Sequence, residues 1–143
     1  MKLFTIGFTK KSARDFFSRL KHSGATRLVD IRLNNVSQLA GFAKRDDLEF
    51  FAEAICGITY HHVPELAPTQ EIRDAYTKNN ASWEQYEQDF LDLMASRQIE
   101  RMDKSLFDGA CLLCSEDKPE HCHRRLVAEY LKTKWGNIDI VHL

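Results

Sequence analysis

Strand-like apolar segments alternate with helix-like amphipathic segments along the whole of this 143-residue chain. Such alternation is typical of a mostly parallel β-sheet with helices packed on both of its faces. The segments that read as strands are residues 3–6, 27–31, 58–63, 110–114 and 138–142. We therefore expect an α/β fold: a single three-layer, Rossmann-like domain over residues 1–143, with about five mostly parallel strands.

The segments between these strands carry helix signals. Ser12 and Ser82 are each followed three residues later by a side chain that suits a capping box, and Gly24 and Gly57 fit positions just past helix ends. A last helix begins near residue 122 or 123. Two apolar stripes with helical spacing are interpreted as core: Leu48, Phe51, Ala52 and Ile55 in the second helix, and Trp83, Tyr86, Phe90 and Met94 in the third. Residues 33–45 and 64–81 are predicted as long connections, and residues 99–108 are ambiguous.

Charge and hydropathy exclude several classes of partner. The formal net charge is −1 and no long Lys/Arg run occurs, which disfavours strong sequence-independent nucleic-acid binding, because counterion release needs many cations on one face. A local cationic pocket for a small anionic ligand is compatible with this balance. No apolar run approaches the roughly 20 residues that span a bilayer, and the first residues lack a signal-peptide pattern. We expect a cytoplasmic protein with no membrane partner; the sequence assigns neither a cofactor nor an oligomeric state.

Polar and reactive side chains follow the carboxyl ends of the predicted strands, where open α/β sheets bind ligands. In chain order these residues are Gly7, Thr9, Asp30, Arg32, Tyr60, Cys114 and Glu116. Gly7 permits close approach of the backbone to a ligand. Asp30 and Arg32 share one side of their strand, either as a structural ion pair or as an orienting carboxylate beside an anion-binding guanidinium. We expect all but the last two residues of this set to bind substrate.

The densest group of such residues runs from Cys114 and Glu116 to Cys122, His123 and Arg124. It joins a buried strand to the start of a helix, where unpaired N–H groups and a partial positive charge favour anions and thiolates. Arg124 adds a fork of donors for an anion. We expect Cys114 or Cys122 to be the nucleophile and Glu116 or His123 to move a proton. Cys114, Glu116 and Cys122 are thus the candidate catalytic residues, with His123 and Arg124 beside the substrate.

Other roles for the four cysteines stay open. Cys114 could simply end a buried strand, or form a redox pair with Cys122. Cys114, Cys122 and His123 could hold a metal ion or an iron–sulfur cluster. Cys111 shows zinc-ligand spacing to Cys114, but a straight strand points positions three apart to opposite faces. Cys56 and Cys111 are therefore interpreted as core residues.

Four pieces of the chain resemble the domain of unknown function 488 family. They are Thr5-Ile6-Gly7-Phe8-Thr9; Val29-Asp30-Ile31-Arg32 with Asn35 and Ser37; Gly57-Ile58-Thr59-Tyr60; and Leu113-Cys114-Ser115-Glu116 followed by Cys122-His123-Arg124. The last piece is the most specific. Relatives often carry Leu-Gly-Gly where this chain has Leu66-Ala67-Pro68, so the loop at this position differs. The resemblance implies a compact α/β domain and supplies no established reaction.

The leading hypothesis is a thiol-dependent enzyme that acts at the loop between residues 114 and 122. Its substrate would be phosphate-bearing or otherwise anionic, and related to nucleotides or nucleic acids, because a helix start suits phosphate. One alternative is a non-catalytic anion- or nucleotide-binding module, in which the cysteines only pack. The other is a metal or iron–sulfur site formed by Cys114, Cys122 and His123.

Overall fold

The computed structural model describes residues 1–36 and 41–143, and within them five strands form one sheet. The strands are β1 (Lys2–Gly7), β2 (Arg27–Asp30), β3 (Thr59–His62), β4 (Ala110–Cys114) and β5 (Asp139–His142). Their order is β3-β2-β4-β1-β5, and every neighbouring pair is parallel. The predicted parallel α/β sheet is confirmed. Ser37, which belongs to one piece of the family resemblance, and part of the predicted connection 33–45 lie outside the described residues.

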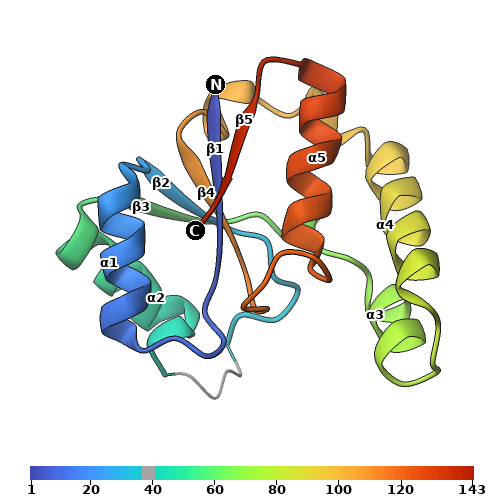
Figure 1. The fold of residues 1–143 in the computed structure, drawn as a ribbon, viewed down its shortest axis with the longest axis horizontal. Coiled ribbons are helices and arrows are strands. Elements are labelled where there is room, and N and C mark those ends of the chain that lie inside the picture. Colours follow the sequence, from blue (N-terminus) through green and yellow to red (C-terminus); the bar gives the residue numbers. More distant parts are fainter. Residues whose placement is uncertain (37–40) are drawn as a thin grey trace.

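Five α-helices surround the sheet in the described part of the chain (Figure 1). They are α1 (Ala13–Ser23), α2 (Arg45–Phe51), α3 (Gln70–Thr77), α4 (Trp83–Arg97) and α5 (His123–Trp135). Helices α1 and α2 cover one face, α4 and α5 cover the other, and α3 packs against α4. Four 3₁₀ turns and one π-helical turn complete the described elements: η1 (Gly41–Ala43), η2 (Ala52–Cys56, the π turn), η3 (Pro64–Leu66), η4 (Ile99–Arg101) and η5 (Lys104–Leu106). The three-layer arrangement is confirmed.

The predicted helix ends carry the expected serine caps and left-handed glycines. The Oγ atoms of Ser12 and Ser82 each accept a hydrogen bond of 3.1 Å from the backbone N–H three residues further on, which satisfies one of the unpaired donors at a helix start. Gly24 and Gly57 adopt left-handed φ angles of 79° and 67° directly after α1 and η2, a conformation that favours glycine.

Two segments differ from their predictions. Helix α2 stops at Phe51 and continues as the π turn η2, in which more residues make up each turn and the 3.6-residue spacing no longer holds. Leu48 and Ala52 are buried as predicted, but Ile55 is 44% exposed. The predicted connection 64–81 contains a further helix, α3, which Thr69 caps by accepting a hydrogen bond from Ile72 N–H.

The alternation of side chains along β4 divides the core into two clusters. Cys111 and Leu113 pack with α1 and α2 on one face, whereas Leu112 and Cys114 pack with α4 and α5 on the other. The prediction that Cys111 and Cys114 point to opposite faces is confirmed, and they belong to no common site.

Strand β4 lies between β2 and β1, so the chain crosses over at the centre of the sheet. The segment after β1 leads to α1 on one face, and the segment after β4 leads to α5 on the other (Figure 1). Ligands of open α/β sheets bind outside the carboxyl ends of strands at such a switch point. This order differs from the 3-2-1-4-5 order of dinucleotide-binding folds, and the sequence had left it undetermined.

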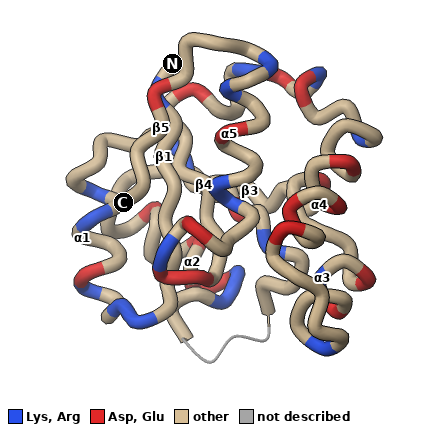
Figure 2. The backbone as a smooth tube through the Cα atoms, turned by 45° about the vertical axis from the view of Figure 1, so that its right-hand side comes forward, with Lys and Arg blue, Asp and Glu red and all other residues tan. Residues whose placement is uncertain are grey.

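Two surface properties bear on the partners. None of the helices in the described residues is both long enough and apolar enough to cross a bilayer. In the view of Figure 2, Lys and Arg residues are interspersed with Asp and Glu residues, and α4 carries mostly acidic charge, with Glu84, Glu87, Asp89 and Asp92. A nucleic-acid backbone would be repelled by this helix.

Candidate functional site

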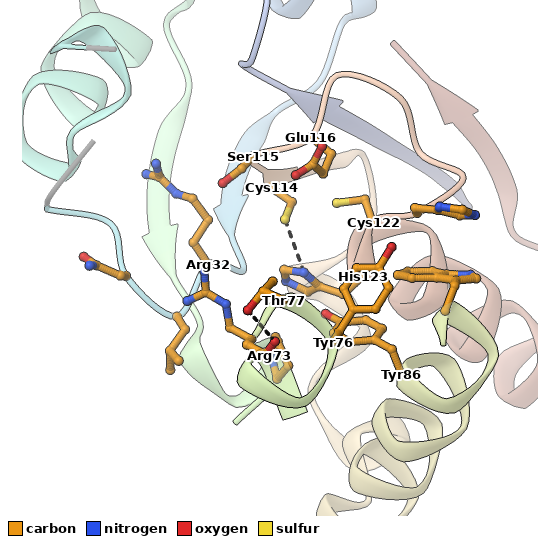
Figure 3. A pocket seen from close by; sticks show the side chains of 15 residues that line it. Arg32, Arg73, Tyr76, Thr77, Tyr86, Cys114, Ser115, Glu116, Cys122 and His123 are labelled. Carbon is orange, nitrogen blue, oxygen red and sulfur yellow. Dashed lines mark hydrogen bonds between the residues drawn. The ribbon is translucent and has the colours of Figure 1, made fainter. Parts of the chain in front are cut away.

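A cavity of about 360 Å³ opens where the carboxyl ends of β2 and β4 meet the start of α5. Five of the residues predicted for the site line it together: Arg32, Cys114, Glu116, Cys122 and His123. Figure 3 shows Cys114, Cys122 and His123 grouped on one side of the cavity. The prediction that the two sulfurs and the acid of the β4–α5 loop share one hollow with Arg32 agrees with the structure, whereas Arg124, which the same prediction placed there, does not line the cavity.

The closest contact in this group joins Cys114 to His123. The sulfur of Cys114 lies 3.2 Å from His123 Nδ1, and Nε2 of the same ring lies 2.7 Å from the carbonyl oxygen of Ile31. Because a carbonyl oxygen only accepts, Nε2 carries a proton and donates it to Ile31. Nδ1 of the neutral ring is therefore the nitrogen that can take the proton of the Cys114 thiol. The tertiary structure thus gives His123 the geometry of a base.

The two sulfurs of the loop differ in acidity. Burial raises the pKa of the Cys114 thiol, but a hydrogen bond from Cys122, the backbone N–H groups of Ser115 and Glu116 and the charge of Arg124 outweigh it, and the net pKa is lowered. Burial and the neighbouring Cys114 raise the pKa of Cys122 well above its usual value. Cys114 is therefore the more acidic thiol of the pair.

Arg32 is fixed by acidic and aromatic neighbours. Its Nε and Nη2 donate to the two carboxylate oxygens of Asp30 at 2.9 and 2.8 Å, and the hydroxyl of Tyr60 donates to the same carboxylate at 2.5 Å. The guanidinium also lies over the Phe8 ring, 5.3 Å from its centroid. Its Nη1 atom is buried with no hydrogen-bond partner among residues 1–36 and 41–143. An unpaired buried donor is costly, so a hydrogen-bond acceptor placed beside this atom would be favourable.

Asp30 and Tyr60 act through Arg32 rather than at the cavity. Asp30 is fully buried, and neither residue lines the cavity. Burial raises the pKa of Tyr60, as does its hydrogen bond to Asp30, so its hydroxyl stays a donor. The Asp30–Arg32 interaction predicted from their spacing is thus a bidentate ion pair. The structural interpretation is confirmed, and anion binding by Arg32 stays a prediction.

Three residues predicted beside the substrate instead hold the β4–α5 loop. Arg124 is fully buried and donates to Thr5 Oγ1 and to the carbonyl oxygens of Glu116 and Asp117. The Thr9 hydroxyl donates to the carbonyl oxygen of Ser115 at 2.6 Å. A Cβ on Gly7 would lie 1.6 Å from the Glu116 carbonyl oxygen. The close backbone approach that Gly7 permits is therefore to the loop of the protein itself.

Glu116 occupies the rim of the cavity. Its side chain is exposed, and its backbone carbonyl is the group that Arg124 binds. His123, and not Glu116, contacts the sulfur of Cys114. Of the two residues predicted to move a proton, His123 is therefore the one within hydrogen-bond distance of the thiol.

Several lining residues were not predicted as site residues. They come from α3 and α4: Arg73, Tyr76, Thr77, Trp83 and Tyr86. Tyr86 is buried, as the apolar stripe of α4 predicted, but Trp83 is only partly covered and faces the cavity. Helical spacing indicates which side chains face the body of the protein and does not distinguish a packed core from the wall of a pocket. Arg73 lies on α3, in a segment that the sequence predicted as a connection.

The Cys114–Cys122–His123 group also has the geometry of a possible metal-ligand set. Its two sulfurs and one imidazole nitrogen all lie within 4.8 Å of one another, and all three residues are buried. The hydrogen bond from His123 Nε2 to a backbone carbonyl is the support that metal-binding imidazoles commonly have. Two thiolates and one imidazole would leave a fourth zinc position open towards the cavity.

Comparisons with known proteins identify the family of this chain but assign it no activity. No curated protein and no solved structure matches the chain. One family model, described as "Domain of unknown function DUF488", matches residues 12–131. This range contains Arg32, Arg73 and the whole β4–α5 loop, so the site described above lies within the matched part. The chain belongs to the DUF488 family of domains of unknown function.

Proposed function

We propose that this protein is a thiol-dependent enzyme that acts on a phosphate-bearing or other anionic substrate, related to nucleotides or nucleic acids, at the β4–α5 loop. The observation that carries the proposal is the Cys114–His123 contact in a cavity that Arg32 also lines, with an Nη1 atom that has no hydrogen-bond partner among the described residues. A nucleophile, a base and an anion anchor are the parts that such an enzyme needs. We place the protein in the cytoplasm as one domain over residues 1–143, since its free thiols suit a reducing compartment.

The chemistry follows from the roles of three side chains. His123 Nδ1 takes the proton of Cys114, and the sulfur forms a bond to an electrophilic atom of the substrate. The leaving group departs with a proton from His123, or from Glu116 at the rim. Arg32 binds the anionic group of the substrate through Nη1 and holds the electrophilic atom towards the sulfur. Cys122 stabilises the thiolate by donating its S–H.

Selective alkylation tests the nucleophile. The native protein is treated with iodoacetamide near pH 7, and modified cysteines are identified by mass spectrometry. We expect Cys114 to react first, and inorganic phosphate to slow this reaction by covering the neighbouring anion site. Cys111 is the internal control, because burial raises its pKa and it faces the opposite core. Equal inertness of Cys114 and Cys111 would contradict the proposal and favour the non-catalytic binding module.

The second candidate function is a metal centre, which the spacing of the two sulfurs and the imidazole nitrogen favours. Protein purified anaerobically and under reducing conditions is analysed for zinc and iron, and titrated with Co²⁺, whose thiolate complexes absorb visible light. About one metal ion per chain, lost in Cys122→Ala and retained in Cys111→Ala, would establish this centre in place of the nucleophile. No bound metal and a reactive Cys114 would support the thiol enzyme.

A further inference from the structure

The cavity beside Cys114 has two walls of different chemistry. One wall is aromatic and comes from α3, α4 and the end of the β4–α5 loop: Tyr76, Trp83, Tyr86 and His121. The Trp83 ring stacks on the Tyr86 ring, with centroids 4.8 Å apart and planes 19° apart, and on the His121 ring at 4.8 Å and 21°. Trp83 lies between the other two rings of this parallel stack, so a planar ligand ring would pack on an outer face of the stack or against its edge.

The other wall is cationic and comes from β2 and α3. Arg32 lines it, and the Nη1 atom of this residue is buried without a hydrogen-bond partner in the described part of the chain. Arg73 reaches towards Arg32 from α3 (Figure 3), and in the described part of the chain its guanidinium has no hydrogen bond or ion pair. Arg32 is paired with Asp30, whereas Arg73 has no acidic partner among the residues that the structure describes, so an anion beside Arg73 would be favourable.

We infer that this cavity binds a nucleoside monophosphate, with its phosphate between Arg32 and Arg73 and its base against the aromatic wall. The inference rests on the proposed function and deepens it, because it specifies which anionic substrate is brought to Cys114. A dianionic phosphate matches two guanidinium groups better than a carboxylate does. The cavity of about 360 Å³ lies within the range of small-ligand sites. A sugar phosphate would leave the aromatic wall unused, and a nucleoside would leave Arg32 Nη1 unpaired.

Arg73 is the specificity-determining residue in this arrangement. Arg32 is already committed to Asp30 through two of its nitrogens, so it offers one donor group, whereas Arg73 offers its whole fork. Arg73 is also the safer position for a substitution, since it is only partly buried and binds no other described side chain.

Calorimetric titration of the Cys114→Ser protein tests the inference without any thiol chemistry. The ligands are AMP, GMP, CMP and UMP, with adenosine, ribose 5-phosphate and inorganic phosphate for comparison. We expect the best nucleotide to bind about ten-fold or more tightly than ribose 5-phosphate and adenosine. Arg73→Ala should weaken the binding of nucleotide and of phosphate about ten-fold. Arg14→Ala, which removes an exposed side chain of α1, should change neither affinity.

Tryptophan fluorescence gives a second measurement that needs no substitution in the cavity. The chain has two tryptophans, and Trp135 packs against Phe107, away from the cavity. In Trp135→Phe protein the signal therefore reports Trp83. We expect AMP, but not ribose 5-phosphate, to quench the fluorescence of Trp83. Equal affinity for these two ligands, an unaffected Arg73→Ala protein, or no binding by any nucleotide would overturn the inference.

Two further outcomes separate the inference from the proposed function. A reactive Cys114 in a protein that binds no nucleotide would leave the thiol enzyme standing and overturn only the ligand class. Nucleotide binding by a protein whose Cys114 is inert would support the ligand class and overturn the thiol enzyme. A 5′-phosphorylated dinucleotide shows whether the ligand is a free nucleotide or the end of a nucleic-acid chain. If it binds as tightly as AMP, the site recognises nucleic-acid ends, and the assignment to free nucleotides is overturned.

Discussion

His123 Nδ1 lies 3.2 Å from the sulfur of Cys114, while the carbonyl oxygen of Ile31, 2.7 Å from Nε2, holds the opposite side of the ring. Ile31 directly follows β2, and Cys114 ends β4. The backbone directly after β2 therefore orients the imidazole that contacts the thiol at the end of β4. The ring cannot turn to bring Nε2 to the sulfur without losing a buried hydrogen bond.

Removal of this imidazole should slow the reaction of Cys114. In His123→Ala we expect alkylation by iodoacetamide near pH 7 to fall about ten-fold, because the thiol loses the group that takes its proton. The pH profile should move upward towards that of an ordinary thiol. His121→Ala is the matched control, since His121 lines the same cavity and, unlike His123, makes no described contact with Cys114. Equal profiles for wild type and His123→Ala would rule out the role of the base.

Alkaline pH should destabilise the protein through its buried thiols. Burial raises the pKa of Cys111 above the usual value of 9.0, so the unfolded chain loses this proton first as pH rises. The unfolded state then binds fewer protons than the folded state, and the free energy of unfolding falls as pH rises above the unfolded pKa, by up to about 1.4 kcal/mol per pH unit for one thiol.

Urea denaturation at a series of pH values between about 8 and about 10 measures this slope. Cys111→Ala should give a slope that is shallower by about 1 kcal/mol per pH unit, whatever its effect on stability at neutral pH. Identical slopes for the two proteins would mean that Cys111 ionises in the folded state.

An added methyl group at Gly7 should disrupt the β4–α5 loop. The new Cβ would lie 1.6 Å from the Glu116 carbonyl oxygen and 2.6 Å from Arg124 Nη1, so the loop must move. We expect Gly7→Ala to lower the free energy of unfolding by about 3 kcal/mol or more. Gly41→Ala, where a Cβ meets nothing within 4 Å, should stay within about 0.5 kcal/mol of wild type. Thermal unfolding of the two variants gives the comparison.

Arg124 should matter for stability far more than its neighbour Arg125. Arg124→Met leaves the carbonyl oxygens of Glu116 and Asp117 without their donor, which should cost about 3 kcal/mol or more. Arg125 pairs with Glu87 and Glu129 near the surface, so Arg125→Ala should cost about 1 kcal/mol or less. Equal losses in urea denaturation would show that Arg124 does not hold the loop.

The sequence by itself determined the local elements and half of the site. Caps and glycines specified where α1 and α4 begin and where α1 and η2 end, because their hydrogen bonds and φ angles involve residues within one turn. The apolar run of β4 and the helix start at Cys122 placed Cys114, Cys122 and His123 at the same loop. The parallel register of β2 with β4 then brought Arg32 to the same edge of the sheet.

Only the tertiary structure decided which reactive groups reach the cavity and which support it. Both Arg32 and Arg124 were predicted to bind substrate. Arg32 keeps one Nη1 atom without a hydrogen-bond partner among the described residues, whereas Arg124 donates to Thr5 and to two loop carbonyls. Arg73, Trp83 and Tyr86 join the site because α3 and α4 line the same cavity as the residues that follow β2 and β4. These relationships depend on contacts between segments far apart in the chain. The spacing of residues within one segment does not predict such contacts.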